Sequence, residues 1–262
     1  MTPIFRLRSP TAQALPILAN LPHSGLFVPE AMRQQLTAAH QAFLPNQDWH
    51  LDHLYDFLPE LGITMLQATH SRYVVDLNRS LKPLYFGNFW SAVVAKQTAF
   101  NAPLYQIPPS AQAIEQRLQD YYRPYHAELK HQLSRLIEQF GKVYLLDLHS
   151  FLGLIDDEIC LGNANGKSCS NLLITTVNTA FANQGFGVVR NKVFKGGYIT
   201  QHYGGLPNVE ALQIEVRYPV YLNETQLDQP IVPDWQVPQL EQAKQRFAKV
   251  FKHIAGILAL MV

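Results

Sequence analysis

Polar side chains that could do chemistry stand at the ends of strand-like segments of this sequence. His149 ends the apolar run YLLDLHS, His23 follows the run PILANLP, and Glu215 lies late in the run ALQIEVRY. Because open α/β sheets bind ligands at the carboxyl ends of their strands, these side chains can meet in one crevice. Two histidines and a carboxylate suit a catalytic zinc site, in which an open position holds water and a nearby glutamate takes its proton.

A second group of polar residues accompanies the segment RYVVDL, residues 72–77, which we also predict to be a strand. Asp76 lies within this segment, and Asn78 and Arg79 follow it. Asp76 could orient a ligand imidazole through a hydrogen bond, and so could Asp147, which shares a strand face with the second histidine. The alternative for both is an ordinary hydrogen-bonding role at a strand end.

Strand-like and helix-like segments alternate along the chain, which predicts an α/β sheet covered by helices. Predicted strands are residues 16–22, 64–69, 72–77, 142–148, 186–194 and 211–218. Predicted helices are residues 48–62, 127–141, 170–185 and 238–258, while residues 80–110 should form a surface loop or cap. The polar strand ends would then lie along one edge of this sheet.

The composition limits the class of protein. With 262 residues, of which 47% are hydrophobic, we expect a single domain that spans residues 1–262. A net charge of +1 gives no surface for nucleic acid or an anionic membrane, and no apolar segment reaches the roughly 20 residues that cross a bilayer. Cys160 and Cys169 form no CxxC motif and should be reduced thiols. We therefore expect a cytoplasmic protein with a small-molecule partner.

Seven stretches of the sequence together resemble the N-formylglutamate amidohydrolase family. In chain order they are LPHSG, DWHLDHLYDF, HSRYVVDLNR, LLDLHS, GNANGKSC, GGYITQHYG and LQIEVR, and they run from residue 21 to 217. The resemblance implies a mixed, mostly parallel central sheet flanked by helices, of the kind found in zinc carboxypeptidases and aspartoacylase. It also implies a hydrolase that holds one Zn²⁺ per chain and cleaves N-formyl-L-glutamate to formate and glutamate, as in histidine degradation.

Carried over residue by residue, the resemblance assigns a role to each polar strand end. His23 and His149 become zinc ligands, Glu215 becomes the general base and then the general acid, and Asn78 with Arg79 becomes the clamp for a substrate carboxylate. Alternation along LQIEVR offers a plain alternative for the glutamate, because every second residue there is polar, as on a solvent-facing strand side.

The third metal ligand departs from the pattern of the carboxypeptidase relatives. These take an acidic ligand three residues after the first histidine, and Leu26 occupies that position here. We therefore place the carboxylate ligand at Asp48, at the start of a predicted helix. Asp52 or another acid is the alternative.

The substrate that the resemblance implies carries two carboxylates, so a second cationic anchor is needed. Arg72 and Arg217 are the candidates, although each could equally be a surface strand residue. Tyr198 and His202 lie in GGYITQHYG, beside paired glycines, in a segment that is either a mobile loop covering substrate or a tight connection.

Two other classes of function remain open at this stage. A carboxypeptidase-like amidase could act on another N-acyl amino acid or a short peptide, and a catalytically silent relative could bind metal or ligand without turnover. His126 and His131 are set aside as metal ligands, because five residues on a helix place them about 140° apart, and we predict both at the surface. The sequence does not indicate an oligomeric state.

Overall fold

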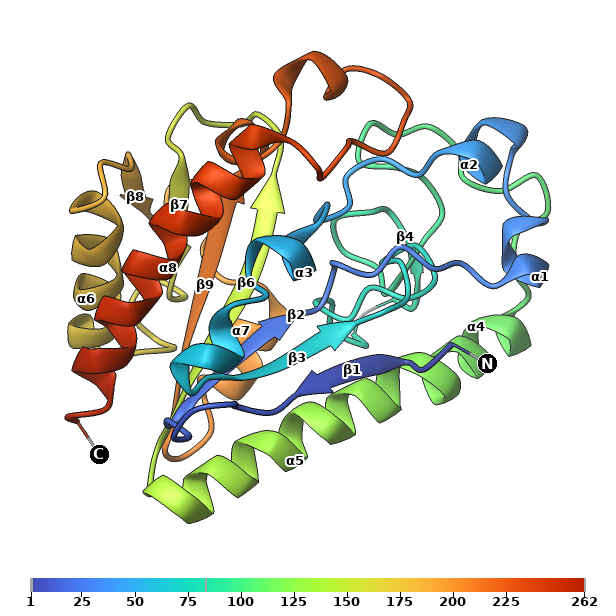
Figure 1. Ribbon diagram of the computed structural model, residues 1–262. Coiled ribbons are helices and arrows are strands. Elements are labelled where there is room, and N and C mark those ends of the chain that lie inside the picture. The colour runs from blue at the N-terminus through green and yellow to red at the C-terminus, as the bar shows by residue number, and fades with distance from the viewer. Residues whose placement is uncertain (1, 83, 262) are drawn as a thin grey trace.

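The computed structural model describes residues 2–82 and 84–261, and these contain a central seven-stranded sheet between two layers of helices (Figure 1). The strand order is β1-β3-β2-β6-β9-β7-β8. These strands are β1 Phe5–Arg8, β2 Ile17–Leu21, β3 Thr64–Ala68, β6 Val143–Phe151, β7 Ile159–Gly162, β8 Val188–Arg190 and β9 Val209–Arg217. Strands β3, β2, β6 and β9 run parallel, and β1 and β7 pair antiparallel with β3 and β9. The predicted mixed, mostly parallel sheet is confirmed.

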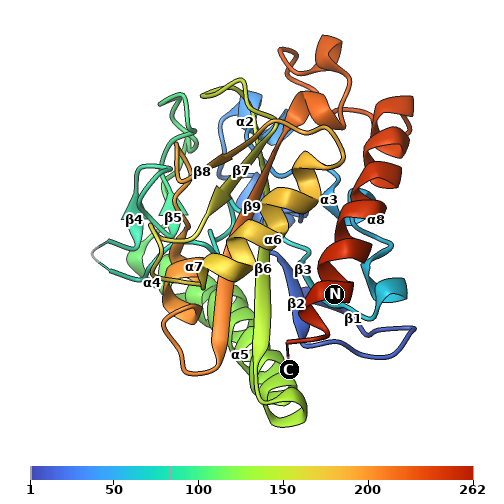
Figure 2. The ribbon, with the colours of Figure 1, turned by 90° about the vertical axis from the view of Figure 1, so that its left-hand side faces the viewer.

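Helices cover both faces of the sheet, with α6 and α8 on one side and α5 and α7 on the other (Figure 2). The α-helices are α1 Glu30–Arg33, α2 Ala38–Ala42, α3 Leu51–Leu54, α4 Ala111–Arg117, α5 Arg123–Phe140, α6 Asn171–Ala182, α7 Tyr198–Tyr203 and α8 Pro238–Leu258. Short 3-10 or π turns occupy Leu58–Leu61, Leu118–Tyr122, Tyr218–Val220 and Glu224–Gln226, and the strands β4 Phe86–Gly87 and β5 Val94–Ala95 form a separate pair. No helix within the described ranges is long and apolar enough to cross a membrane.

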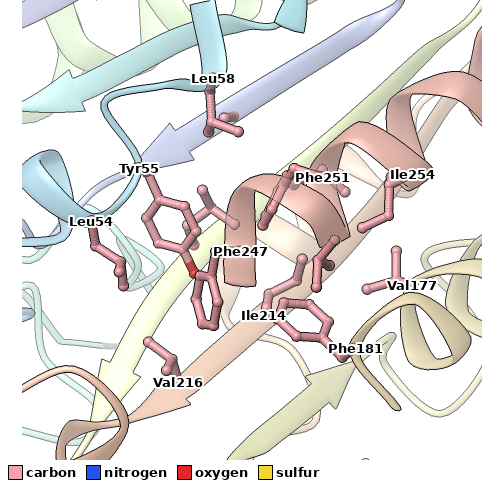
Figure 3. Packing of buried hydrophobic residues seen from close by; sticks show 14 of the residues in the cluster. Leu54, Tyr55, Leu58, Val177, Phe181, Ile214, Val216, Phe247, Phe251 and Ile254 are labelled. Carbon is pink, nitrogen blue, oxygen red and sulfur yellow. The ribbon is translucent and has the colours of Figure 1, made fainter. Parts of the chain in front are cut away.

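The apolar core explains why the central strands could be read from the sequence. Every residue of β2 and β6 is buried, as expected for parallel strands that are covered on both faces. On the α8 face, Phe181 packs edge-on against Phe247 and Phe251 with ring centroids 5.3 and 6.2 Å apart (Figure 3). The same cluster includes apolar side chains of β6 and β9, the two strands that carry His149 and Glu215 towards their carboxyl ends.

The segment 72–77 was predicted to be a strand, and this prediction is wrong. The segment forms turns in which Val74 N–H donates to the Ser71 carbonyl and Asp76 N–H donates to the Val93 carbonyl. Its apolar side chains nevertheless divide between two clusters, with Tyr73 and Val74 in one and Val75 and Leu77 in the other. Because these side chains contact two hydrophobic clusters, the sequence of residues 72–77 resembles that of a buried strand although the backbone is irregular.

Other boundaries also differ from the prediction. The predicted helix over 48–62 begins only at Leu51, because His50 adopts a left-handed conformation with φ 55°. It then breaks into α3 and the 3-10 helix Leu58–Leu61, where Pro59 has no N–H for the helical ladder. The predicted strand over 186–194 shortens to β8, and β1 and β7 were not predicted. The helices expected at 127–141, 170–185 and 238–258 are confirmed as α5, α6 and α8.

Candidate metal and catalytic site

A cavity of about 350 Å³ opens at the carboxyl ends of β2, β6 and β9. Its walls bring together most of the side chains that the sequence singled out. The polar and charged residues that line it are His23, Asn46, Asp48, Arg72, Asn78, Arg79, His149, Ser150, Lys195, Gln213 and Glu215. The predicted meeting of polar strand ends in one crevice is therefore confirmed.

The backbone sets the positions of the three candidate metal ligands. His23 lies two residues beyond the end of β2, and its carbonyl accepts a hydrogen bond from Asp48 N–H in the loop before α3. His149 lies within β6, which pairs with β2, the strand that leads into His23. The side chains of all three residues are at most 3% exposed.

The three side chains converge on one point, and His23, Asp48 and His149 offer ligand atoms that all lie within 4.8 Å of one another. Asp48 Oδ2 lies 2.9 Å from His149 Nδ1 and 3.7 Å from His23 Nδ1. Two imidazole nitrogens and a carboxylate oxygen, buried together, are the donor set of a catalytic zinc site. The residues therefore fit a divalent metal ion.

Carboxylates hold the far sides of both imidazole rings. Asp76 Oδ1 lies 2.7 Å from His23 Nε2, and Asp147 Oδ2 lies 3.3 Å from His149 Nε2. A ring whose Nε2–H donates to a carboxylate keeps the lone pair of Nδ1 for a metal ion. The predicted orienting role of the two aspartates agrees with this geometry.

The two histidines differ in their electrostatic surroundings. Burial, together with the nearby Arg72 guanidinium, lowers the pKa of His23 to about 4, so its imidazole is neutral at pH 7. Burial alone would also lower the pKa of His149, but the charges and hydrogen bonds of Asp147 and Asp48 raise it well above its usual range. A metal ion that binds His149 must therefore displace a proton.

Glu215 lies on β9 directly opposite His149 in the parallel register. Its Oε1 accepts a hydrogen bond of 2.7 Å from Gln213 Nε2, while its Oε2 is buried without a hydrogen-bond partner among the described residues. Burial raises the pKa of Glu215 to about 7, and the charge of Asp48 adds to this rise while His149 opposes it. A carboxylate with one free oxygen and a pKa near neutrality suits a general base.

The alternative of a solvent-facing side for β9 is wrong for two of its three polar residues. Gln213 and Glu215 are 4% and 5% exposed, because the turn before α7 covers this face of the strand, where Gly197 N–H donates to Gln213 Oε1. Sequence analysis did not single out Gln213 as a site residue. Its only signal was its position two residues before the glutamate on the same strand face.

Arg72 and Arg79 both line the cavity but differ in their partners. Arg72 binds Asp76 Oδ2 through Nε at 3.2 Å and Nη2 at 2.7 Å, and its guanidinium lies over the ring of Phe89. Arg79 donates to the Asn78 carbonyl, and its buried Nε lies 3.9 Å from the same Asp76 Oδ2 but has no hydrogen-bond partner in the described chain. Arg79 therefore keeps a donor for an anionic ligand, whereas Arg72 is already neutralised.

Asn78 lies in the cavity wall between the second histidine and the first turn of α7. Its Oδ1 accepts a hydrogen bond from Ile199 N–H, and its Nδ2 lies 3.0 Å from His149 Nε2. Because that ring nitrogen carries the hydrogen that faces Asp147, it cannot also accept a hydrogen bond from the Asn78 amide. The Oδ1 contact therefore fixes the side chain, and the Nδ2 donor is not satisfied by His149.

Three predicted substrate-binding residues do not line the cavity. Arg217 lies beyond its wall, where Nη2 is 3.5 Å from Asp156 Oδ1. Tyr198 and His202 stack on each other within α7, with ring centroids 5.0 Å apart, because GGYITQHYG forms a helix instead of an open loop. Their proximity in sequence to the paired glycines therefore did not bring them to the site.

The prediction of a surface position is wrong for His126 on α5. Its Nε2 lies 3.0 Å from the Leu77 carbonyl oxygen and its Nδ1 lies 2.9 Å from the Tyr203 hydroxyl, so the ring joins α5 to α7. His131 is exposed, as predicted.

Known proteins resemble this chain over most of its length. A model of the N-formylglutamate amidohydrolase family matches residues 15–222. A protein from Pseudomonas putida named N-formylglutamate deformylase is 38% identical over 227 residues, which are 81% of this chain and 84% of the relative. Its namesake from Pseudomonas aeruginosa is 37% identical over 225 residues, which cover 80% of this chain and 83% of the relative.

A solved structure agrees with these sequence relatives. The crystal structure of an N-formylglutamate amidohydrolase from Ralstonia eutropha superimposes with a TM-score of 0.86 at 25% identity and covers 99% of both chains. The family match extends from just before β2 to the turn after β9, and so includes every candidate ligand and the candidate base. The chain belongs to the N-formylglutamate amidohydrolase family.

Proposed function

We propose that this protein hydrolyses N-formyl-L-glutamate to formate and glutamate, with one Zn²⁺ ion held by His23, Asp48 and His149. The observation that carries the proposal is the unpartnered Oε2 of Glu215, which lines the same cavity as this buried ligand triad. The Pseudomonas relatives support the choice of substrate through their names and their match to about four fifths of the chain.

Glu215 and Gln213 act together with the metal ion in the proposed reaction. Zinc, when bound, supplies a Lewis acid that polarises the formyl carbonyl and lowers the pKa of a water molecule. Glu215 takes a proton from the attacking water through Oε2 while Gln213 holds Oε1. The new C–O bond forms at the formyl carbon, the C–N bond breaks, and Glu215 returns the proton to the leaving nitrogen. The products are formate and the free amine of glutamate.

Arg79 is the proposed anchor for the α-carboxylate of the substrate. Arg79 lines the cavity, its side chain is 18% exposed, and its buried Nε lies 3.9 Å from Asp76 Oδ2 without a hydrogen bond to any of residues 2–82 and 84–261. A guanidinium binds a carboxylate through two parallel hydrogen bonds, which fix both the position and the plane of the ligand. Such an anchor places the formyl amide at a constant distance from the catalytic carboxylate.

Measuring formate release from a panel of substrates tests the proposed function. We expect N-formyl-L-glutamate to be the best substrate, because the cavity supplies cations for its two carboxylates. N-formylglutamine and N-formylleucine should react with kcat/KM lower by roughly tenfold or more, since each lacks one charge-assisted contact. Equal rates on all three would favour a broader amidase, and metal binding without turnover of any of them would favour a silent relative.

We expect Arg79→Lys to lower kcat/KM for N-formylglutamate by roughly tenfold or more. Lysine keeps the charge but cannot form the bidentate pair, and a charge-assisted hydrogen bond in a dry pocket contributes about 1.5 to 3 kcal/mol. Steady-state kinetics of the purified variant measure the change. Arg8→Lys, at an exposed position on the edge strand β1, is the matched control and should leave kcat/KM unchanged. An unaltered kcat/KM in Arg79→Lys would remove Arg79 from substrate binding.

A further inference from the structure

The proposed substrate needs a second cation, which must recognise its side-chain carboxylate. Within the described ranges, Arg72, Arg79 and Lys195 are the lysine and arginine residues that line the cavity. Arg72 is neutralised by two hydrogen bonds to Asp76, and Arg79 is the anchor proposed for the α-carboxylate. Arg217, the other candidate from the sequence, faces Asp156 outside the cavity. Of the described cationic residues that line the cavity, Lys195 is therefore the one that remains for the side-chain carboxylate.

Lys195 carries a cation that no protein group uses. Its ammonium forms neither an ion pair nor a hydrogen bond with any part of the chain that the structure describes, although other lysines do pair. Lys192, only three residues earlier, lies 2.9 Å from Asp157, and Lys244 lies 2.7 Å from Asp56. Lys195 is exposed and is also one of the residues that line the cavity, so an anion in the cavity can reach its ammonium.

The backbone of Lys195 is fixed by close contacts on both sides. A Cβ atom on Gly162 would lie 2.8 Å from the Lys195 carbonyl carbon. Glycine at position 162 therefore allows the end of β7 to approach the backbone at Lys195. The same Lys195 carbonyl accepts a hydrogen bond from Ala164 N–H. Gly196, the next residue, has φ +113°, a conformation that residues with a side chain rarely adopt. The lysine therefore extends from a constrained turn.

This turn is also tied to the catalytic residues. Gly197 N–H donates to Gln213 Oε1, and the amide of Gln213 in turn donates to Glu215 Oε1. A Cβ atom on Gly197 would collide with the amide of Asn78, so this glycine is pressed against the cavity wall. The backbone of Lys195 is therefore held at a set distance from the proposed base, and the length of the lysine side chain sets how far its ammonium reaches.

We propose that Lys195 binds the side-chain carboxylate of the substrate and thereby selects an acidic N-formyl amino acid over a neutral one. The inference rests on the proposed hydrolysis of N-formylglutamate and adds the residue that reads its side chain. A flexible lysine at an exposed position makes a single charge-assisted contact that solvent weakens, so its contribution should be smaller than that of a buried bidentate arginine.

The test compares two substrates of nearly the same shape. N-formylglutamine replaces the side-chain carboxylate by a neutral amide, so a variant that removes only the cation should affect one substrate and spare the other. We expect Lys195→Gln to lower kcat/KM for N-formylglutamate by about fivefold, mainly through KM, and to leave kcat/KM for N-formylglutamine within about 1.5-fold. Lys195→Arg should keep most of the preference for N-formylglutamate. Lys192→Gln, on the same segment but paired with Asp157, is the matched control and should change neither substrate.

The possible failures are distinguishable. Equal losses on both substrates would show that Lys195 only shapes its turn, and wild-type kcat/KM values on both substrates would show that it contacts neither of them. Either result overturns the inference while the proposed function stands. A wild-type protein with bound metal that releases no formate from N-formylglutamate would instead overturn the proposed function.

Discussion

Replacing His23 or His149 by alanine should remove the bound metal and abolish formate release. Each imidazole supplies one of three ligand atoms that lie within 4.8 Å of one another, and two remaining ligands hold zinc far more weakly than three. Loss of either ring also leaves a buried carboxylate, Asp76 or Asp147, without its imidazole partner. Metal analysis of the purified variants after dialysis, together with formate release, measures both effects.

The control for this experiment is a histidine outside the site. His131→Ala, at an exposed position on α5, should keep wild-type metal content and activity. Full zinc occupancy in His23→Ala or His149→Ala would contradict the proposed ligand set. Unfolding must be excluded by circular dichroism, since a misfolded variant loses metal for another reason. His149→Gln and His23→Gln, which preserve a polar side chain of similar size, should also lose metal.

The same measurement separates the alternatives for the carboxylate ligand. Asp48→Ala should lose metal, because its Oδ2 lies between the Nδ1 atoms of both histidines. Asp52, the alternative from the sequence, lines a different cavity together with His50 and His53. Asp52→Ala should therefore retain metal and activity. Retained metal in Asp48→Ala together with lost metal in Asp52→Ala would assign the third ligand to Asp52.

The two histidines that sequence reasoning located correctly share one property. His23 follows and His149 ends a strongly apolar run, and a buried central strand is recognisable because both of its faces must be apolar. A polar residue that ends such a run is conspicuous. Glu215 lies in an alternating run, so its place at the site rested on the resemblance. The order of parallel strands then brings the ends together without further information.

Residues on irregular backbone were harder to predict. Asp48 reaches the site from a loop, and no spacing rule connects it to His23; the resemblance and its place in the chain were the only guides. Arg217 lies two residues beyond Glu215 on the same strand, yet its side chain pairs with Asp156 outside the cavity. A period of two predicts the strand face but not where the cavity ends.

Lys195 and Gln213 could not be identified from the sequence because their roles depend on a close contact between distant segments. Gly162 must approach the Lys195 backbone, and Gly197 must donate to Gln213, before either side chain belongs to the site. The sequence showed the paired glycines but not which residue beside them would face the cavity. Tyr198 and His202, the two residues predicted there to bind substrate, lie on α7 and do not line the cavity.

Glu215→Gln should lower kcat by roughly 10²-fold or more while zinc content and KM stay close to wild type. The substitution is nearly isosteric, and the glutamine oxygen can still accept the hydrogen bond from Gln213 Nε2. The new amide nitrogen then occupies the position of Oε2, which has no protein partner to lose. Only the ability to take and return a proton disappears, so the loss should appear in kcat.

Three outcomes decide the role of Glu215. A near-normal kcat would remove it from proton transfer, and a loss of zinc in Glu215→Gln would make it a metal ligand instead of a base. Glu210→Gln is the matched control, because Glu210 lies on the same strand but at its opposite end, where it pairs with Lys142 and Ser170.

Glu215→Asp separates charge from position: it keeps a carboxylate but withdraws it by one methylene from both Gln213 and the cavity. A kcat as low as that of Glu215→Gln would mean that the reach set by the Gln213 hydrogen bond matters as much as the basicity of the group.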